Sequence, residues 1–367
     1  MKKLKKLTAL LAALALVFVL GSCANGSKND PTNQPTIKET LESIDGVYYY
    51  EYAGDYKLED CINADLKTEY ELLTYLYKFI PELLGVEERS VSFDFNSNGF
   101  ACCSITANNA GSAGGKIYGR NFDYPNSAAM VVHTKPTTGY ESISTCYPAF
   151  VTLKDEWAPE NEMAKTFVGA ASIFAPLDGM NEKGFYISVL QLDREETNQT
   201  AEGKHDIQTT VAIRYLLDNA DSVEKALELL DGFNMHNVFN TAYHFALADT
   251  TGKSVVVEYI NNVKYVSETK VVTNHYLTPN SGKPAPASTD NTLLRYNAAF
   301  NAGESVNWNM TPEQVRDALN AASASQHHIN DPDSTLVSIW SAVFEPSIKK
   351  VTYYFREDYT KGFEVTF

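Results

Sequence analysis

The chain has 367 residues, of which 46 are acidic and 30 are basic, so its formal net charge is −16 at pH 7. This acidic balance argues against binding of nucleic acid or of anionic lipid headgroups through the surface. The five cysteines are scattered and do not form a disulfide scaffold. No C-x-x-C or H-E-x-x-H spacing occurs, so we do not expect a structural zinc site.

The N-terminus predicts export. Four lysines between positions 2 and 6 precede an apolar run from Leu7 to Leu20, and Gly21-Ser22-Cys23 follows. The pattern is that of a secretory signal and is too short for a transmembrane helix. Its end resembles a bacterial lipobox, which implies that residues 1–22 are a lipoprotein signal peptide and that lipidated Cys23 anchors the protein outside the cytoplasm, at the cell membrane. An ordinary secretory signal with an incidental Cys23 is the alternative.

Residues 23–36 are rich in small, polar and proline residues, which predicts a flexible tether. Residues 37–101 come next and contain apolar side chains at near-helical spacing over 67–84, which predicts a helix. Pro81 lies late in this stretch, and we expect it to bend or end the helix.

The remainder of the chain alternates between blocks of strands and blocks of helices. Residues 91–148 are strand-rich and punctuated by glycines. The further predicted strands are 184–192, 243–249, 254–259, 270–273, 335–344 and 350–355, and the predicted helices are 210–219, 222–230, 293–301 and 311–323. Such blocks, without strict βαβ alternation, predict an α+β fold of stacked antiparallel sheets with helices outside.

Residues with catalytic chemistry concentrate in one predicted hairpin. Cys102 and Cys103 head its first strand, and Arg120 and Asp123, which are three residues apart, follow its second. A nearby cation lowers the pKa of a thiol, and a carboxylate can hold a free α-amine, whose own pKa near 8 suits a base. On residue types alone, a buried strand cysteine beside a surface Arg–Asp pair explains this stretch at least as well.

A set of motifs in order extends the pattern over residues 100–360. Gly119-Arg-Asn-Phe-Asp123 follows the hairpin turn, and Asp178–Gly184 and His244–Glu258 come later. Together they resemble the N-terminal-nucleophile cysteine hydrolases of the choloylglycine hydrolase family. The resemblance implies a four-layer αββα sandwich that needs no cofactor. It also implies hydrolysis of the linear amide bond of an N-acyl amide, of the conjugated bile salt, penicillin V or fatty-acyl amide type, through a thioester.

The same resemblance implies that the nucleophile starts the mature catalytic chain. Family members that begin Cys-Thr-Ser-Ile align with Cys102-Cys103-Ser104-Ile105, which favours Cys102; a start at Cys103 stays open. Only one of the two thiols can point into the site, because strand faces alternate. An internal cysteine has no α-amine, so we expect cleavage between Ala101 and Cys102. Residues 37–101 are then a pro-segment or small chain, and residues 102–367 are the catalytic domain.

The family roles carry over position by position. Arg120 is expected beside the thiol, where it favours the ionised form, and Asp123 is expected to hold the freed α-amine. Asn274 is expected to donate its amide to the oxyanion, with Gln191 at the position of the remaining oxyanion donor. Arg295 is expected to orient the site.

Two other functions remain open at this stage. One is acyl transfer, as in isopenicillin-N acyltransferase-like proteins, which share the fold and the nucleophile. The other is a lipid-anchored binding protein without catalysis. The acyl group, the amine and the oligomeric state do not follow from the sequence.

Overall fold

The computed structural model describes residues 35–85, 100–125, 127–154, 157–192, 197–237, 241–279, 282, 285–330 and 334–367. The expected signal peptide, Cys23 and nearly all of the expected tether lie outside the described residues, as do residues 86–99. Within the described ranges, the helices are all too short or too polar to cross a membrane.

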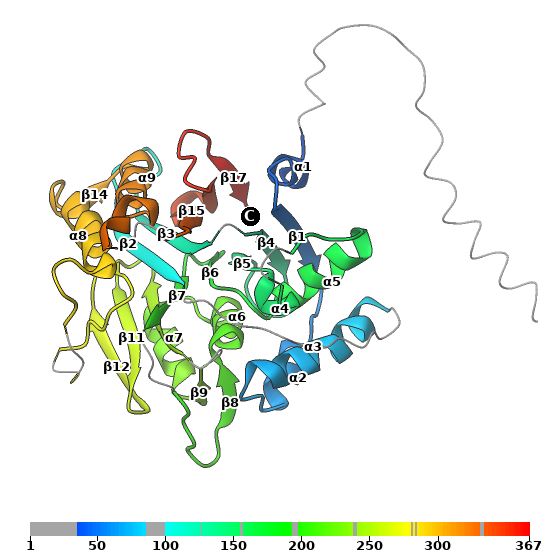
Figure 1. Cartoon of the computed structure of the whole chain (residues 1–367). Coiled ribbons are helices and arrows are strands. Elements are labelled where there is room, and N and C mark those ends of the chain that lie inside the picture. The colour runs from blue at the N-terminus through cyan, green and yellow to red at the C-terminus, as the bar shows by residue number, and fades with distance from the viewer. Residues whose placement is uncertain are drawn as a thin grey trace, which may run out of the picture. The chain divides into compact units, whose positions relative to one another are not determined.

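Two large sheets form the centre of the domain (Figure 1). The eight-stranded sheet has the order β1-β4-β5-β6-β7-β10-β11-β12, and β1 pairs with β4 in parallel while the other neighbours are antiparallel. Its strands are β1 Val47–Ala53, β4 Ala129–Lys135, β5 Ser142–Cys146, β6 Asp178–Asn181, β7 Tyr186–Leu192, β10 Ala242–Ala248, β11 Ser254–Ile260 and β12 Val263–Glu268.

The seven-stranded sheet has the order β13-β2-β3-β15-β16-β17, with β14 paired to β2. Its strands are β2 Ala101–Asn109, β3 Lys116–Pro125, β13 Val271–Val272, β14 Asn309–Met310, β15 Leu336–Glu345, β16 Lys350–Phe355 and β17 Phe363–Thr366. A separate two-stranded sheet joins β8 His205–Gln208 to β9 Phe233–His236.

Helices cover the outer faces of both large sheets. The helices α5 Glu162–Ser172 and α6 Thr209–Asn219 pack on the eight-stranded sheet, and α8 Asn291–Glu304 and α9 Pro312–Ala321 pack on the seven-stranded sheet. The two sheets meet through β2 and β7. The predicted αββα layering is therefore confirmed. The remaining helices are α1 Ile37–Glu42, α2 Leu58–Asn63, α3 Glu69–Leu84, α4 Ala149–Thr152, α7 Val223–Leu230, and the 3₁₀ turns η1 Ser325–Asn330 and η2 Pro346–Ile348.

The expected pro-segment is built into the eight-stranded sheet. Its strand β1, which the sequence did not predict, lies at the sheet edge beside β4 along its whole length. The predicted helix over 67–84 is α3, which Thr68 begins with a capping box. Pro81 does not end α3, which continues to Leu84 and stops at Gly85, a residue with positive φ. Residues on both sides of the expected cleavage site therefore share one core.

Most predicted element bounds agree with the structure within a few residues, and the differences have local causes. The predicted strand 184–192 begins at Tyr186, because Gly184 has a φ of +79° and forms a turn. The predicted strand 270–273 is shortened to Val271–Val272, because the carbonyl of Thr273 leaves the ladder to accept a hydrogen bond from a histidine side chain. Ser222 caps α7, as the sequence predicted.

Candidate active site

The two adjacent cysteines point to opposite sides of the seven-stranded sheet. Cys102 lies opposite Phe122 of β3, and both side chains belong to the core between the two sheets. Cys103 belongs to the separate cluster under α8 and α9. Because neighbours along a strand alternate faces, only Cys102 reaches the inter-sheet space. Its side chain is 0% exposed in this uncut chain.

Arg120 lies on the same face as the Cys102 thiol and is fully buried. Its Nη2 donates to the carbonyl of Val189 at 2.8 Å, and its Nε is 3.4 Å from Asp178 Oδ2. The indole of Trp340 donates to the same carboxylate oxygen at 2.8 Å. Burial opposes the charge of Arg120, but the interactions with Cys102 and Asp178 outweigh it and raise the pKa of the guanidinium. The sequence placed Asp178 in a motif but did not identify it as the partner of Arg120.

The thiol of the uncut chain is protonated at neutral pH. Burial raises the pKa of Cys102 to about 11, against the opposing effect of Arg120. The sequence expectation gave the direction of the Arg120 effect but not the larger effect of burial. An activated thiolate therefore requires that the site open or that its surroundings change.

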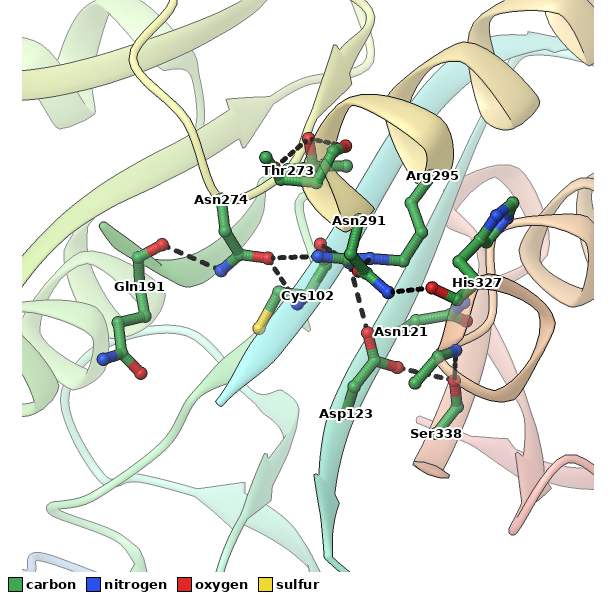
Figure 2. A network of polar contacts seen from close by, with 12 residues as sticks. Cys102, Asn121, Asp123, Gln191, Thr273, Asn274, Asn291, Arg295, His327 and Ser338 are labelled. Atoms are coloured by element: carbon green, nitrogen blue, oxygen red, sulfur yellow. Dashed lines mark hydrogen bonds and ion pairs between the residues drawn. The ribbon is translucent and has the colours of Figure 1, made fainter. Parts of the chain in front are cut away.

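Asn274 connects the nucleophile to the rest of the site (Figure 2). Its Oδ1 accepts the backbone N–H of Cys102 at 2.7 Å and the Nη2 of Arg295 at 2.8 Å. Its Nδ2 donates to the carbonyl of Gln191 at 2.8 Å. Because Oδ1 accepts two hydrogen bonds and Nδ2 donates one, these contacts determine the orientation of the Asn274 amide. The Asn274 amide nitrogen is thus held beside the backbone of Cys102.

A buried ion pair lies behind the nucleophile (Figure 2). Arg295 of α8 is 3.2 Å from Asp123 Oδ2 through Nη1, and the same nitrogen donates to the carbonyl of Cys102. Ser338 donates to the other oxygen of Asp123 at 2.5 Å. Burial raises the pKa of Asp123, while Arg295 opposes this. Asp123 pairs across the strands with Ala101, so its carboxylate lies next to the expected cleavage site.

Gln191 holds the residue that precedes this site. Its Oε1 accepts the backbone N–H of Phe100 at 2.6 Å, and its Nε2 is 3.3 Å from Thr241 Oγ1. Its backbone carbonyl is the group that accepts from Asn274. The structure thus brings all the predicted site residues together around the Ala101–Cys102 bond. Gln191 makes these contacts through its side chain and its backbone carbonyl.

Buried His244 supports the segment before Asn274. His244 of β10 is buried, with Nε2 at 2.8 Å from the carbonyl of Thr273 and Nδ1 at 3.0 Å from Glu258 Oε1. A carbonyl only accepts, so Nε2 carries a hydrogen. His244 and Glu258 are direct cross-strand partners of β10 and β11, a pairing that their strand pattern could have revealed.

Glu258 also holds the segment after Asn274. Its carboxylate accepts the backbone N–H of Leu277 at 2.8 Å and of Thr278 at 2.7 Å. Burial opposes its ionisation, but the hydrogen bonds from His244 and from these amides lower the pKa of Glu258. His244 and Glu258 thus bracket Asn274 from both sides.

Comparison with known proteins identifies the family. The family model described as linear amide C–N hydrolases, choloylglycine hydrolase family, matches residues 102–276, so the match begins at Cys102. This part of the chain belongs to the family. Membership agrees with the observed layers and with the order of the sequence motifs.

Two curated relatives and one solved structure show how far the similarity reaches. A penicillin V acylase from Pectobacterium atrosepticum is 29% identical over 135 residues, which are 32% of this chain and 36% of that protein. A bile salt hydrolase/transferase from Clostridium perfringens is 36% identical over 89 residues, 22% of this chain and 27% of that protein. The matched part thus spans about a third of these relatives' length.

The fold is similar to that of a conjugated bile acid hydrolase from Clostridium perfringens, solved as a mutant. The TM-score is 0.53 at 15% sequence identity, over 72% of this chain and 92% of that chain. This similarity supports the α+β fold of an N-terminal-nucleophile hydrolase.

Proposed function

We propose that the protein is an amidase that hydrolyses N-acyl amides with Cys102 as its nucleophile. The observation that carries the proposal is the convergence of Arg120 on the thiol and of Asn274 on the backbone of Cys102. The family match that begins at Cys102 supports the same register. The named relatives act on penicillin V and bile salts. Such amides, together with fatty-acyl amides, are the substrate classes to test.

Activity in this proposal requires cleavage of the Ala101–Cys102 bond. The Cys102 thiol adds to the carbonyl of Ala101, the peptide nitrogen leaves as the α-amine of Cys102, and a thioester joins Ala101 to the sulfur. Water then hydrolyses the thioester, which releases a carboxylate on Ala101 and restores the thiol. The network of Arg295 and Asn274 around the Cys102 backbone holds the new N-terminus in place.

The same groups then act on an external amide. The free α-amine takes the proton of the Cys102 thiol, and the sulfur attacks the amide carbonyl. The Asn274 amide nitrogen has a second hydrogen to donate to the oxyanion, and one such donor contributes roughly 3 kcal/mol. The amine leaves with a proton from the N-terminus, and water hydrolyses the thioester. Asp123, next to this N-terminus, stabilises the ammonium form that exists after the attack and before the proton passes to the leaving amine.

Acyl transfer is the second candidate, because one matched relative is named a hydrolase/transferase. The thioester is the branch point: water gives hydrolysis, and an amine gives transfer. Product analysis in the presence of added glycine or taurine distinguishes the two, since a transferase forms a new amide whereas a hydrolase forms only the free acid.

The place of action is also part of the proposal. The signal pattern and Cys23 support an exported lipoprotein held at the membrane by its lipid. Because the acidic protein surface repels anionic headgroups, the proposal attributes attachment to the membrane to the lipid on Cys23 and not to the protein surface.

The direct test compares Cys102→Ala and Cys103→Ala with the wild type on a panel of conjugated bile salts, penicillin V and fatty-acyl amides. We expect the wild type and Cys103→Ala to release acid and amine, and Cys102→Ala to release neither. An acyl-type thiol probe should label Cys102 in the active protein. A wild-type protein that binds these amides without turnover or labelling would instead be a binding protein.

A further inference from the structure

Phe100, the second residue before the expected cleavage site, fills a cage of aromatic rings. Its ring centroid lies 5.3 Å from that of Phe122, 6.0 Å from that of Phe150 and 5.7 Å from that of Tyr243. The ring of Tyr243 is stacked on it at an interplanar angle of 22°. We call Phe122, Phe150 and Tyr243 the aromatic cage. All three rings are buried, and they come from β3, α4 and β10.

The cage adjoins the nucleophile. Phe122 is the direct cross-strand neighbour of Cys102 and lies on the same sheet face. Tyr243 faces Gln191 across β7 and β10, and Gln191 accepts the backbone N–H of Phe100. The backbone and the ring of Phe100 are thus both held, one by Gln191 and the other by the cage.

Self-cleavage and amide hydrolysis pass through the same kind of intermediate, a thioester on Cys102. In self-cleavage the acyl group is the chain that ends in Phe100-Ala101. Both reactions place the acyl carbon on the Cys102 sulfur, so the side of the sulfur where Ala101 and Phe100 now lie is the side expected for the acyl group of an external substrate. Phe100 therefore occupies the place of a substrate acyl tail.

We propose that the aromatic cage is the acyl pocket of the cleaved enzyme and that it binds an aryl ring at the end of a flexible acyl chain. This inference rests on the proposed function. The length of the chain follows from the covalent path. Ala101 Cα and N and Phe100 C, Cα and Cβ separate the Ala101 carbonyl carbon from the ring. A 6-phenylhexanoyl amide reproduces that path atom for atom.

Cleavage frees the chain end that fills the cage. Hydrolysis of the thioester converts the Ala101 carbonyl into a carboxylate that is no longer bonded to Cys102. In the proposal, this chain end then withdraws Phe100 from the cage. In the uncut chain the cage is filled and the thiol is fully buried, so external amides are excluded until self-cleavage is complete.

The test measures kcat/KM of the cleaved enzyme for coumarin amides of 6-phenylhexanoic, phenylacetic and hexanoic acids. We expect the 6-phenylhexanoyl amide to exceed the hexanoyl amide on the order of 30-fold, because only the former buries a ring in the cage. Tyr243→Leu and Phe150→Leu each remove one ring and should reduce this ratio at least threefold. Tyr259→Leu is the matched control, since it removes a buried tyrosine from the neighbouring strand β11 and should leave the ratio unchanged.

Each outcome decides a separate point. If the enzyme cleaves the hexanoyl amide as well as the 6-phenylhexanoyl amide, the cage is not the acyl pocket, while the amidase proposal stands. If the ratio is high but the cage variants and Tyr259→Leu all leave it intact, the ring binds elsewhere and the assignment is wrong. If no amide of the whole panel is cleaved by self-cleaved protein, the proposed function fails and this inference fails with it.

Discussion

The variant Glu258→Gln tests whether the buried pair of His244 and Glu258 positions Asn274. Three donors converge on the Glu258 carboxylate: Nδ1 of His244 and the backbone N–H groups of Leu277 and Thr278. Glutamine keeps one oxygen and replaces the other with a donor. The better orientation keeps the oxygen facing His244 and Leu277, which sets an NH₂ group against the N–H of Thr278.

The expected effect on stability follows from the hydrogen bonds that glutamine cannot make. One hydrogen bond to a charged group is lost, worth about 1.5–3 kcal/mol, and the remaining contacts face a neutral amide in place of a carboxylate. We therefore expect the free energy of unfolding to fall by about 3 kcal/mol. If the segment that carries Asn274 shifts, the oxyanion loses a donor and kcat falls by about 10²–10³-fold. KM should change little, because Asn274 acts on charge that develops in the transition state.

The assay combines chemical unfolding with kcat and KM on the best amide of the panel. Glu268→Gln is the control, since it removes the same charge from an exposed position of β12 and should leave both measurements unchanged. A Glu258→Gln protein that loses stability but keeps the wild-type kcat would refute the positioning role. A protein that keeps both would refute the buried pair itself.

The pH dependence of stability gives a second check on Glu258. Its folded pKa lies below the ordinary value of 4.5, so its contribution to stability is fully present above pH 4.5 and is lost as the pH falls through the folded pKa. As the pH is lowered from 4.5, the free energy of unfolding of the wild type should therefore fall more than that of Glu258→Gln. Parallel stability curves for the two proteins would contradict the lowered pKa.

Three further predictions concern single residues. Arg120→Lys keeps a positive charge near Asp178 but loses the planar fork that reaches Val189, so activity should fall at least 100-fold, and the free energy of unfolding should fall by about 1–3 kcal/mol because the buried Val189 carbonyl loses its donor; wild-type rates would remove Arg120 from the site. Cys103→Ala should lower the free energy of unfolding by about 1 kcal/mol, because its sulfur is buried under α8 and α9, and should cleave and turn over normally; loss of cleavage would favour the Cys103 register. Cys23→Ser should move the protein from the membrane fraction to the medium, and unchanged membrane association would contradict lipidation.

The layers of the fold could be predicted from the sequence because their elements carry local signals. Thr68 and Ser222 cap helices that begin at the next residue, and β15 and β16 are apolar and close to their predicted bounds. Strand β1 was missed because its residues Val47–Ala53 include three consecutive tyrosines and do not alternate between apolar and polar side chains, and because its role depends on pairing with β4, which is distant in the sequence. No local signal reports such a pairing.

The site divides in the same way. The motif around Arg120 and Asp123 and the late Asn274 could be assigned through the family resemblance, and the structure brings them together. The supporting contacts could not be assigned. Asp178 contacts Arg120 only because the two sheets are stacked. His244 contacts the carbonyl of Thr273 only because strand β13 ends before that residue. Burial, which raises the pKa of Cys102, is likewise a property of the packed chain.

The central claim is that Cys102 becomes an N-terminal nucleophile by self-cleavage, and sequencing the N-terminus of the larger fragment of the active protein tests it most directly. The account predicts two fragments on a denaturing gel, with the larger beginning Cys-Cys-Ser-Ile and the two co-purifying under native conditions because β1 remains paired with β4. Cys102→Ala should stay a single, inactive chain. A wild-type protein that is fully active while uncut, or a Cys102→Ala protein that is still cut after Ala101, would contradict the account.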